Sequence, residues 1–581
     1  MKQFQFTYHD HDTLQRELVK IRQWSKSHIT SVVVFQVYSE LLDRRLIDAI
    51  VDQIRTELPS ALVMGCSTNG NIREGRFSEA DILIVCTVLE FPSSRAELFQ
   101  YELTDETAGA VTADLLAKLE TRPWVKAIEL LVTIRGMSMS TFCDELQKAR
   151  EDIAIFGGGA FSNNIDNNAA CVFSSAGDYS EKGVVFLLMG GDDIEVETVH
   201  ITGWKPLGRT FRVTRAERNL LYELDGAPAY DVYYKYLNIR NDEHFFFNSL
   251  EFPFFYEHNG IQILRAPTAS NADGSLVMTS DMEENVRANL AYGDPRTILD
   301  SIRKGAQQLA KFSPEIIHVF SCAARRTFWG ISEVSKETLP FQRLAPTSGF
   351  YTSGEFLRTN TKMNQHNVTL VVAALREGPA SAKQDISSLL DDDDYSGKVS
   401  MINRLANFID AATHELEEAN EKLARVAITD GLTQLYNRAE IQRRIKEMHL
   451  AGTEFSLLML DIDDFKHVND TYGHKEGDLV ITGLSDILRK STEKYPIASA
   501  GRWGGEEFML LIPWDLPEAV KAAECLRRQF AELTFPTAPH QTVSIGVTKA
   551  IPHEPLDDLL IRVDKALYEA KHSGKNRCIV L

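Results

Sequence analysis

The chain has 581 residues, 44% of them hydrophobic, which is enough apolar material for several separate cores. Its 82 acidic residues outnumber its 62 basic ones, and the net charge of -20 argues against nucleic-acid polymers as partners. The N-terminus shows no apolar signal region and no uncharged stretch could cross a bilayer, so neither a membrane nor export is expected. Seven scattered cysteines favour reduced thiols and hence a cytoplasmic protein.

Apolar runs in the N-terminal part of the chain predict buried strands at residues 31–35, 61–65 and 81–85. A helical pattern at 41–58 separates the first two of these strands. Because strands and helices alternate, we expect an α/β architecture for this part of the chain.

Motifs of small residues recur along the same part of the chain. They are Gly65-Cys66-Ser67-Thr68, Phe156-Gly157-Gly158-Gly159-Ala160, Gly203-Trp204-Lys205-Pro206-Leu207-Gly208, Asn219 with Leu224-Asp225-Gly226-Ala227-Pro228, Ser321-Cys322-Ala323-Ala324-Arg325, and Thr347-Ser348-Gly349-Phe350 with Gly354-Glu355-Phe356. Together they resemble the FIST domain, a family of intracellular sensory modules, over about residues 28–375. The resemblance implies a FIST N-terminal sensory domain at 1–225 and a FIST C-terminal sensory domain at 226–380. It also implies an unknown small ligand, since FIST domains are thought to bind small molecules such as amino acids and some are reported as haem proteins that sense nitric oxide.

No residue of this region is assigned to a ligand. The glycine clusters would let backbone amides approach a ligand, but tight turns between strands would need the same residues. Arg325 and Arg326 could clamp a ligand carboxylate or could be exposed loop arginines, whereas Cys66 and Cys322 are expected to be buried structural thiols. Histidines that could bind haem, or could be ordinary core or surface residues, are His9, His11, His200, His244, His258 and His318. Haem in the FIST region is therefore left open and without support.

A linker and a parallel coiled coil are expected at residues 381–427. Residues 378–382 and the acidic run 391–394 are typical of a solvated linker, with metal binding by the acids as the alternative. A parallel two-stranded coil would bring two C-terminal domains to the same end, and the alternative is an amphipathic helix packed on its own chain. The seven-residue apolar repeat that predicts the coil is Ile402, Ile409, Leu416 and Leu423, followed three positions later by Leu405, Ala412, Ala419 and Val426.

Acidic residues follow a predicted buried strand at 455–460, in the run Asp461-Ile462-Asp463-Asp464-Phe465-Lys466. In an extended chain Asp461 and Asp463 point to the same side. A carboxylate of this strand and a carboxylate of the hairpin described next could therefore bind the same cation. Lys466 offers a positive charge to phosphate oxygens. The plainer alternative is an acidic loop in which Asp464 caps the next helix.

A hairpin with two glycines and two glutamates supplies the other carboxylates. Strands are predicted at 497–501 and 508–512, and Gly504-Gly505 between them provides the positive φ of a tight turn and a close backbone approach to a ligand. The adjacent Glu506 and Glu507 repel each other unless a proton or a cation such as Mg²⁺ relieves them. A plain turn with solvated glutamates would show the same residues.

Further motifs surround these two. They are Asp430-Gly431-Leu432-Thr433, Tyr436-Asn437-Arg438, Asn469-Asp470, Gly473-His474, Gly477-Asp478, Ser544-Ile545-Gly546, Asp564-Lys565-Ala566-Leu567-Tyr568, Lys571 and Gly574-Lys575-Asn576-Arg577. From about residue 427 to the C-terminus the chain thus resembles the GGDEF domain of diguanylate cyclases, which join two GTP molecules into cyclic di-GMP. The resemblance implies a GGDEF domain at 428–581 with a ferredoxin-like palm. The whole chain is then expected to be a multidomain α/β protein: FIST sensor, coiled-coil helix and palm.

The resemblance also implies roles for individual residues. Mg²⁺, or Mn²⁺ in its place, would be held by Asp461, the Ile462 carbonyl and Glu506. Either Glu506 or Glu507 would accept the proton of the 3′-hydroxyl, with Lys466 as a further catalytic residue. The implied substrate-binding positions are Phe465, Asn469, Asp478, Gly504, Gly505, Lys571 and Lys575.

Among these positions, Asn469 and Asp478 match contacts to guanine, where an amide and a carboxylate can read a purine edge. The lysines match contacts to phosphate. Position 575 is more often Arg in the family, so weaker phosphate geometry is expected there. Many members also carry Arg-x-x-Asp before the glycines as a product-inhibition site, but this chain has Tyr495-Pro496-Ile497-Ala498, so no such site is expected.

The implied function is a diguanylate cyclase that makes cyclic di-GMP and two pyrophosphates from two GTP. It would work as a homodimer through the coil and respond to a small ligand of the FIST region. One alternative is a catalytically silent regulator that binds GTP or cyclic di-GMP, although its usual mark, a damaged glycine-carboxylate motif, is absent. Another is a haem-based gas sensor that acts through partner proteins, which a Soret absorption band would reveal.

Overall fold

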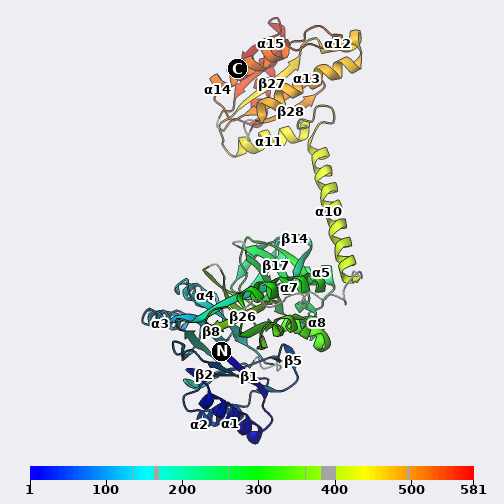
Figure 1. Cartoon of the computed structure of the whole chain (residues 1–581). Coiled ribbons are helices and arrows are strands. Elements are labelled where there is room, and N and C mark those ends of the chain that lie inside the picture. The colour runs from blue at the N-terminus through cyan, green and yellow to red at the C-terminus, as the bar shows by residue number, and fades with distance from the viewer. Residues whose placement is uncertain are drawn as a thin grey trace. The chain divides into compact units, whose positions relative to one another are not determined.

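The computed structural model describes residues 1–134, 137–162, 169–258, 261–359, 361–380, 401–493, 498–551 and 553–581. These residues divide into two compact units, Met1–Ala411 and Ala412–Leu581, which are described separately (Figure 1). The acidic run 391–394 and residues 495–497, on which two sequence-based expectations depend, lie outside the described residues.

Three six-stranded sheets and one eight-stranded sheet form most of the first unit. In hydrogen-bonding order, the first sheet is β1 (Lys2–Thr7), β6 (Ile82–Leu89), β2 (Val32–Ser39), β3 (Leu62–Ser67), β10 (Val172–Ser174) and β11 (Gly177–Ser180). The second is β25 (Lys362–His366), β24 (Glu355–Thr359), β9 (Ala154–Ala160), β8 (Val125–Thr133), β12 (Gly183–Gly190) and β7 (Arg95–Glu102). The third is β13 (Ile194–Ile201), β26 (Leu370–Glu377), β22 (Ile316–Cys322), β23 (Thr347–Thr352), β4 (Asn71–Arg73) and β5 (Arg76–Ser78).

The eight-stranded sheet is β18 (Ile261–Arg265), β17 (Phe254–His258), β21 (Arg287–Gly293), β14 (Trp204–Glu217), β15 (Leu220–Leu224), β20 (Leu276–Met278) and β19 (Pro267–Ser270), with β16 (Ala227–Pro228) paired to β15. Its strands, β14 to β21, lie in the chain between β13 and β22 of the third sheet. The helices of this unit are α1 (His11–Ser27), α2 (Arg44–Glu57), α3 (Ala108–Glu120), α4 (Ser140–Leu146), α5 (Tyr230–Leu237), α6 (Phe245–Leu250), α7 (Pro295–Phe312), α8 (Ala323–Glu333) and α9 (Leu339–Gln342).

Each six-stranded sheet contains a parallel pair of strands with a helix between them in the chain: β2–α2–β3, β8–α4–β9 and β22–α8–β23. Parallel neighbours cannot be joined by a tight hairpin, so each pair needs such a crossover. The strands predicted at 31–35, 61–65 and 81–85 are β2, β3 and β6, and the helical pattern at 41–58 is α2. The predicted α/β architecture is therefore confirmed.

The first sheet is buried on both faces, which explains why its strands are continuous apolar runs. Alternate residues of β6, such as Ile84 and Cys86, pack with α1 and α2, which lie together beside this sheet (Figure 1). The intervening Leu83 and Val85 pack with residues of the other two six-stranded sheets, including Phe156. The three six-stranded sheets thus share one hydrophobic cluster.

The glycines at 157–159 lie inside strand β9, where neighbouring groups leave no room for a side chain. A Cβ at Gly157 would lie 1.9 Å from the Leu130 carbonyl oxygen of the adjacent strand, and one at Gly158 would lie 2.8 Å from the Phe350 ring. Close packing between strands therefore requires glycine here. The interpretation of this cluster as a tight turn is therefore wrong.

Arg325 is fully buried and is neither a ligand clamp nor an exposed loop arginine. Its Nε and Nη2 donate to the two carboxylate oxygens of Glu337 at 3.0 and 2.7 Å, and its Nη1 donates to the Thr202 and Val368 carbonyls. This bidentate pair satisfies the buried charge within the fold. The neighbouring Arg326 donates from Nη1 to both the backbone carbonyl and the side-chain oxygen of Asn69.

The histidines considered as haem ligands have other environments. His318 is buried with its Nδ1 3.1 Å from Glu129 Oε2, and His200 packs against His366 with ring centroids 4.2 Å apart. The side chain of His258 lies outside the described residues. Nothing among the described residues supports haem binding. The remaining three of these six histidines, His9, His11 and His244, are exposed.

Glu355 on β24 gives the first unit a pH-dependent stability. Burial raises its pKa from 4.5 to about 8, although the Thr369 N–H and hydroxyl both donate to the carboxylate. Between these two pH values the folded state keeps a proton that the unfolded state has lost, so stability falls as the pH rises from 4.5 to about 8. We expect Glu355→Gln, which stays neutral, to raise the unfolding temperature at pH 8 and to change it little at pH 5.

Thermal unfolding of the full chain at several pH values measures this effect. Glu195→Gln, at an exposed position of β13, is the matched control and should leave the pH profile of the parent unchanged. If Glu355→Gln kept the parent's pH profile, the carboxyl would not be the group that titrates.

The second unit is built on a five-stranded sheet in the order β28-β29-β27-β30-β31. The central strand β27 (Ser456–Ile462) is antiparallel to both of its neighbours. With helices between β27 and β28 and between β29 and β30, the chain follows the βαββαβ order of a ferredoxin-like fold, so the predicted palm is confirmed. The other elements are α11 (Arg438–Leu450), α12 (Phe465–Tyr472), α13 (His474–Thr492), β28 (Ser499–Gly504), β29 (Glu507–Ile512), α14 (Leu516–Ala531), β30 (Val543–Lys549), α15 (Leu556–His572) and β31 (Cys578–Val580).

Helices cover both faces of this sheet. Leu458 and Leu460 of β27 pack with α13 and α14, whereas Leu457 and Met459 pack with α11 and α15. Alternate residues of one strand thus serve two hydrophobic clusters. Because both faces are covered, polar chemistry is confined to the ends of the strands and the loops that follow them.

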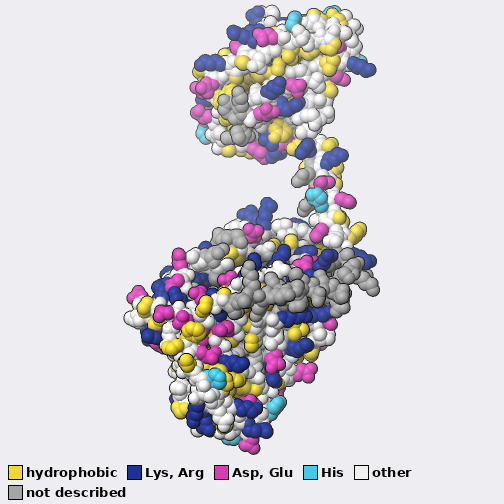
Figure 2. Space-filling view, viewed as in Figure 1, with side chains coloured by type: hydrophobic (Ala, Val, Ile, Leu, Met, Phe, Trp, Pro, Cys, Tyr) yellow, Lys and Arg dark blue, Asp and Glu magenta, His cyan; other side chains and the backbone are white. Residues whose placement is uncertain are grey.

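Helix α10 (Met401–Ile428) carries the predicted heptad repeat on its surface. Five of the larger apolar side chains of this repeat are 42% to 67% exposed, and hydrophobic side chains are visible along the helix in Figure 2. They are Leu405, Ile409, Leu416, Leu423 and Val426. The alternative of packing against the chain's own residues is therefore not seen at these five positions. None of the described helices is long and apolar enough to cross a membrane.

All seven cysteines are free thiols. Cys66 and Cys322 are buried as expected, and burial raises the pKa of both. Cys578 is partly exposed, and burial raises its pKa to about 12. Cys525 on α14 is the one exposed cysteine of the seven.

Candidate active site

The end of β27 and the β28–β29 hairpin bring three acidic residues together. Asp461 on β27 lies opposite Glu507 on β29 in the antiparallel register, so both side chains leave the sheet on the same face. Glu506 precedes Glu507 at the hairpin tip, and its backbone carbonyl accepts the Ile462 N–H at 3.4 Å. Residues that are 45 positions apart in the sequence thus meet at one edge of the sheet.

Gly505 and Glu506 form the turn of this hairpin. Gly504 still pairs with Glu507 in the strand ladder, and Gly505 has a φ of 52°. The positive φ predicted for the pair of glycines is therefore needed at Gly505 alone. A Cβ at either glycine would meet nothing within 4 Å, so the space beside the hairpin tip is open to a ligand.

The charges at this site repel one another. Asp461 is 5% exposed, and its burial, together with Glu506 and Glu507, raises its pKa to about 6. Lys571 on α15 opposes this effect, because its Nζ lies 2.6 Å from Asp461 Oδ2. Burial and the neighbouring Glu506 also raise the pKa of Glu507. Three carboxyl groups face one lysine, which is a setting that a divalent cation stabilises.

Mg²⁺ fits the donors at this edge of the sheet. Among the described residues, no group of three or more His, Cys, Asp or Glu is already arranged as a metal site. Mg²⁺ does not need one, since it is usually held by one or two carboxylates together with substrate phosphates and water. Asp461, the Ile462 carbonyl and Glu506 offer oxygen donors of this kind.

Asp463 has a structural role instead. Its Oδ1 accepts from the Ser544 hydroxyl at 2.6 Å, and its Oδ2 accepts from the Thr542 hydroxyl at 2.7 Å and the Asn576 N–H at 3.0 Å. Asp463 therefore ties β27 to the beginning of β30 and to the segment before β31. Of the two aspartates that were expected to face a cation, only Asp461 has its side chain among the other acids.

Helices α12 and α13 carry the two positions matched to guanine. Asn469 lies on α12 and the exposed Asp478 on α13. A Cβ at Gly477 would lie 2.0 Å from Asn469 Oδ1, so glycine at 477 allows this amide to pack directly against α13, next to Asp478. The ring of Phe465, in contrast, packs into the hydrophobic core.

The lysines matched to phosphate have different surroundings. Lys466 is exposed on the first turn of α12, and Lys571 is paired with Asp461. Lys575 Nζ lies 2.5 Å from the Oδ1 of Asp464, whose side chain makes no capping hydrogen bond to α12, so the capping alternative is wrong. Two of the three lysines thus neutralise acids at the end of β27.

Arg502 is a residue whose part in the site was not foreseen from the sequence. Its Nε and Nη2 donate to the Gly505 carbonyl at 2.9 and 2.7 Å, and its Nη1 donates to Asp430 Oδ1 at 3.3 Å. Asp430 also accepts from the N–H and the hydroxyl of Thr433. The guanidinium group therefore fastens the hairpin tip to the segment that follows α10. The two residues are 72 positions apart, and no local pattern indicates their pairing.

Backbone hydrogen bonds extend this connection to the end of α10. The Asn437 N–H donates to the Ile428 carbonyl at 2.9 Å, and the Tyr436 N–H donates to the Ala500 carbonyl of β28 at 3.1 Å. The Arg502 N–H in turn donates to the Tyr436 carbonyl at 2.8 Å. The last residue of α10 is thus joined through one short segment to the strand that carries the glycine hairpin.

Three parts of the chain match known protein families. Residues 427–577 match the family described as diguanylate cyclase, GGDEF domain, residues 32–227 match the FIST N domain, and residues 229–358 match the FIST C domain. The chain carries a GGDEF domain behind a FIST region. The site at the end of β27 lies within the GGDEF domain.

Curated relatives share the GGDEF part of the chain. Diguanylate cyclase DgcM of Escherichia coli K12 is 41% identical over 170 residues, which are 28% of this chain and 41% of that protein. Diguanylate cyclase VdcA of Vibrio cholerae is 39% identical over 189 residues, which are 31% of this chain and 55% of that protein. The chain thus spans about half the length of the curated relatives it matches. A crystal structure of the coiled coil and GGDEF domain of DgcB from Caulobacter crescentus, in complex with c-di-GMP, is similar at 32% identity, covering 32% of this chain and all of that chain with a TM-score of 0.29.

Removal of the Arg502 side chain should impair the GGDEF domain without unfolding it. We expect Arg502→Ala to lower the rate of nucleotide turnover about 10- to 100-fold, since a small displacement of the hairpin tip misplaces its glutamates. Asp430→Ala should have a similar effect, and the double variant should be no worse than the poorer single one, because the two residues act as a unit. Arg528→Ala, an exposed arginine on α14, is the matched control. Additive losses in the double variant would contradict a shared role.

Proposed function

We propose that this chain is a diguanylate cyclase, which joins two GTP molecules into cyclic di-GMP and releases two pyrophosphates. The observation that carries the proposal is the meeting of Asp461, Glu506 and Glu507 at the end of β27, with Lys571 against them. The relatives of the GGDEF domain that bear the name diguanylate cyclase support the same activity. The intact glycine-carboxylate hairpin counts against a catalytically silent regulator.

The carboxylates are proposed to serve the transfer of the α-phosphoryl group. Bound Mg²⁺, or Mn²⁺ in its place, would supply positive charge to the attacking and leaving oxygens. Asp461, the Ile462 carbonyl and Glu506 would hold it. Either Glu506 or Glu507 accepts the proton of the ribose 3′-hydroxyl, and the raised pKa of Glu507 brings this group closer to the basicity that such a step needs.

The other residues of the site are proposed to bind and orient GTP, which is the main contribution of a protein to phosphoryl transfer. Asn469 and Asp478 hydrogen-bond the guanine edge. The open space beside Gly504 and Gly505 accommodates the phosphates. The residues that complete the substrate site are Phe465 and the phosphate-binding lysines Lys466, Lys571 and Lys575.

The active form is proposed to be a homodimer held by α10. Each GGDEF domain would hold one GTP, and two must meet for a cyclic dinucleotide to form. The exposed apolar side chains of α10 repeat at the a and d positions of a parallel two-stranded coil, which would bring both domains to one end. Without the Arg-x-x-Asp motif, we expect no product feedback through that site.

The FIST region is proposed to regulate the cyclase through α10 in response to a small ligand. The Gly208 N–H of the FIST region donates to Asp410 Oδ1 on α10 at 2.9 Å, and the other end of α10 connects to the Arg502 segment. A helix with contacts at both ends can bias a two-state site by a small change in packing. The cytoplasm, which contains GTP, is the proposed location.

The direct test is chromatography of nucleotides after the purified full chain is incubated with GTP and Mg²⁺. Cyclic di-GMP and pyrophosphate should accumulate, and chelation of the metal should stop both. Binding of GTP without conversion would instead support the silent regulator. A Soret band in a protein that forms no product would support the gas sensor that acts through partners.

A further inference from the structure

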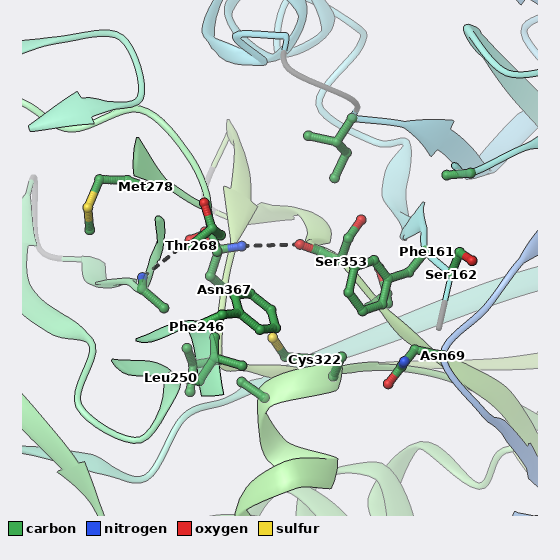
Figure 3. A pocket seen from close by; sticks show the side chains of 18 of the residues that line it. Asn69, Phe161, Ser162, Phe246, Leu250, Thr268, Met278, Cys322, Ser353 and Asn367 are labelled. Carbon is green, nitrogen blue, oxygen red and sulfur yellow. Dashed lines mark hydrogen bonds between the residues drawn. The ribbon is translucent and has the colours of Figure 1, made fainter. Parts of the chain in front are cut away.

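A cavity of about 360 Å³ lies within the first unit, well separated in sequence from the GGDEF residues (Figure 3). Residues of the FIST N match, such as Asn69 and Phe161, line one side, and residues of the FIST C match, such as Phe246 and Met278, line the other. Cavities of roughly 300 to 1,000 Å³ are typical of sites for small organic ligands. The proposed cyclase chemistry makes no use of this one.

Most of the cavity wall is apolar. Figure 3 shows Phe161, Phe246, Leu250 and Met278 around the cavity, and Val368 is also part of its lining. Water gains little in a space with such walls, whereas an organic molecule gains from leaving water. The lining therefore favours a ligand with an apolar body.

Asn367 supplies a polar group at the centre of the same view. Its side chain is almost completely buried, and its Oδ1 accepts from the Ser280 hydroxyl at 2.7 Å and from Arg265 Nη1 at 3.4 Å. Among the described residues, its Nδ2 donates only one long hydrogen bond, to the Ser353 carbonyl at 3.5 Å. A buried amide nitrogen with spare donor capacity favours a ligand that offers an acceptor oxygen.

No charged side chain is found among the described residues that line the cavity. The two arginines of α8 have other partners, because Arg325 pairs with Glu337 and Arg326 donates to Asn69. A charged ligand would thus meet no ion partner among these described lining residues, and a buried charge without a partner costs free energy. The first turn of α8 lines the cavity through Ala323 and Ala324. The N-terminus of a helix attracts an anion weakly through the helix dipole, so the test below includes an anionic probe.

We propose that this cavity is the ligand site of the FIST region and that its ligand is an uncharged organic molecule with an apolar body and an acceptor oxygen, such as an amide or a carbonyl, held by Asn367. This site and this ligand class would serve the sensing role proposed above. Only the regulatory consequence of binding depends on that proposed role. Binding itself requires no cyclase activity, so the two proposals can fail separately.

The test compares three probes that share a phenyl group and differ in charge: phenylacetamide, phenylacetate and phenethylamine. Saturation-transfer NMR on the full-length protein measures their binding at millimolar concentration. We expect the amide to bind and the two ions to bind at least about tenfold more weakly, because neither finds an ion partner among the described lining residues. Preferential binding of either ion would overturn the ligand class.

Two variants place the binding in this cavity. Thr268→Phe, at a half-buried lining position on the edge strand β19, should fill the cavity and remove the amide signal. Thr198→Phe is the matched control, at a half-buried position of the edge strand β13 that does not line the cavity. Binding that survives Thr268→Phe, or no binding of any probe to the parent, would overturn the site.

A third variant tests the role of Asn367. Asn367→Leu should weaken binding of phenylacetamide at least about tenfold and leave binding of toluene, which has no acceptor, unchanged. Retained toluene binding shows that the cavity is intact in this variant. Equal affinity of parent and variant for the amide would contradict recognition by Asn367. Cyclic di-GMP formation, recorded separately on the same samples, reports on the cyclase alone.

Discussion

Glu506→Gln is expected to abolish cyclic di-GMP formation, lowering turnover by at least about 100-fold. The amide keeps the shape of the side chain at the hairpin tip but removes the charge that would bind Mg²⁺ and the oxygen that would accept a proton. Because Glu506 is one of the residues that raise the pKa of Asp461, its neutralisation should also lower that pKa. Chromatography of nucleotides after incubation with GTP and Mg²⁺ measures the loss.

The matched control for this variant is Glu532→Gln, which removes the same charge from an exposed position at the end of α14. It should keep the parent's turnover. Binding of GTP to the Glu506→Gln variant, measured in parallel, separates a loss of catalysis from a loss of substrate. Undiminished turnover in Glu506→Gln would mean that the carboxylate cluster is not the catalytic centre.

Replacement of both Ile409 and Leu416 by Lys should separate the proposed dimer into monomers and lower turnover at least about tenfold at submicromolar protein. Both residues are exposed on α10, and both belong to the first of the two seven-residue series, the positions called a in a coiled coil. Charged side chains at two consecutive a positions would face each other across the coil without partners. Light scattering coupled to size-exclusion chromatography measures the mass, and nucleotide chromatography measures the turnover.

The control introduces the same two charges on the outer side of the helix. His414→Lys with Ala424→Lys changes exposed positions outside the a and d repeat and should leave both mass and turnover unchanged. If the variant with Lys at both 409 and 416 remained a fully active dimer, another surface would bring the GGDEF domains together.

The sequence predicted the parts of the fold that depend on local patterns. The apolar run at 455–460 marked the central strand, and the side chain that follows it, Asp461, lies where the strand was expected to deliver it. The hairpin around Gly505 was marked in the same way. Both features follow from the alternation and the turn chemistry of a few adjacent residues.

Features that depend on distant partners could not be predicted. The roles of Arg502 and Arg325 are set by Asp430 and Glu337, and nothing near either arginine in the sequence indicates its partner. The glycines at 157–159 were misinterpreted for a related reason: glycine in a turn and glycine beneath a neighbouring strand look alike until the neighbour is known. The cavity of the FIST region is likewise assembled from segments spread over 300 positions, from Asn69 to Val368.

The distribution of thiols provides a natural place for a spectroscopic label. Cys525 on α14 is exposed, whereas the other cysteines are buried or, at Cys578, partly covered with a raised pKa. A thiol-reactive nitroxide should therefore attach at Cys525 in the unaltered protein and place one paramagnetic centre in each GGDEF domain of the proposed dimer. Pulsed electron paramagnetic resonance would then measure the distance between the two centres. A change in this distance on addition of GTP would show how far the two GGDEF domains move relative to each other.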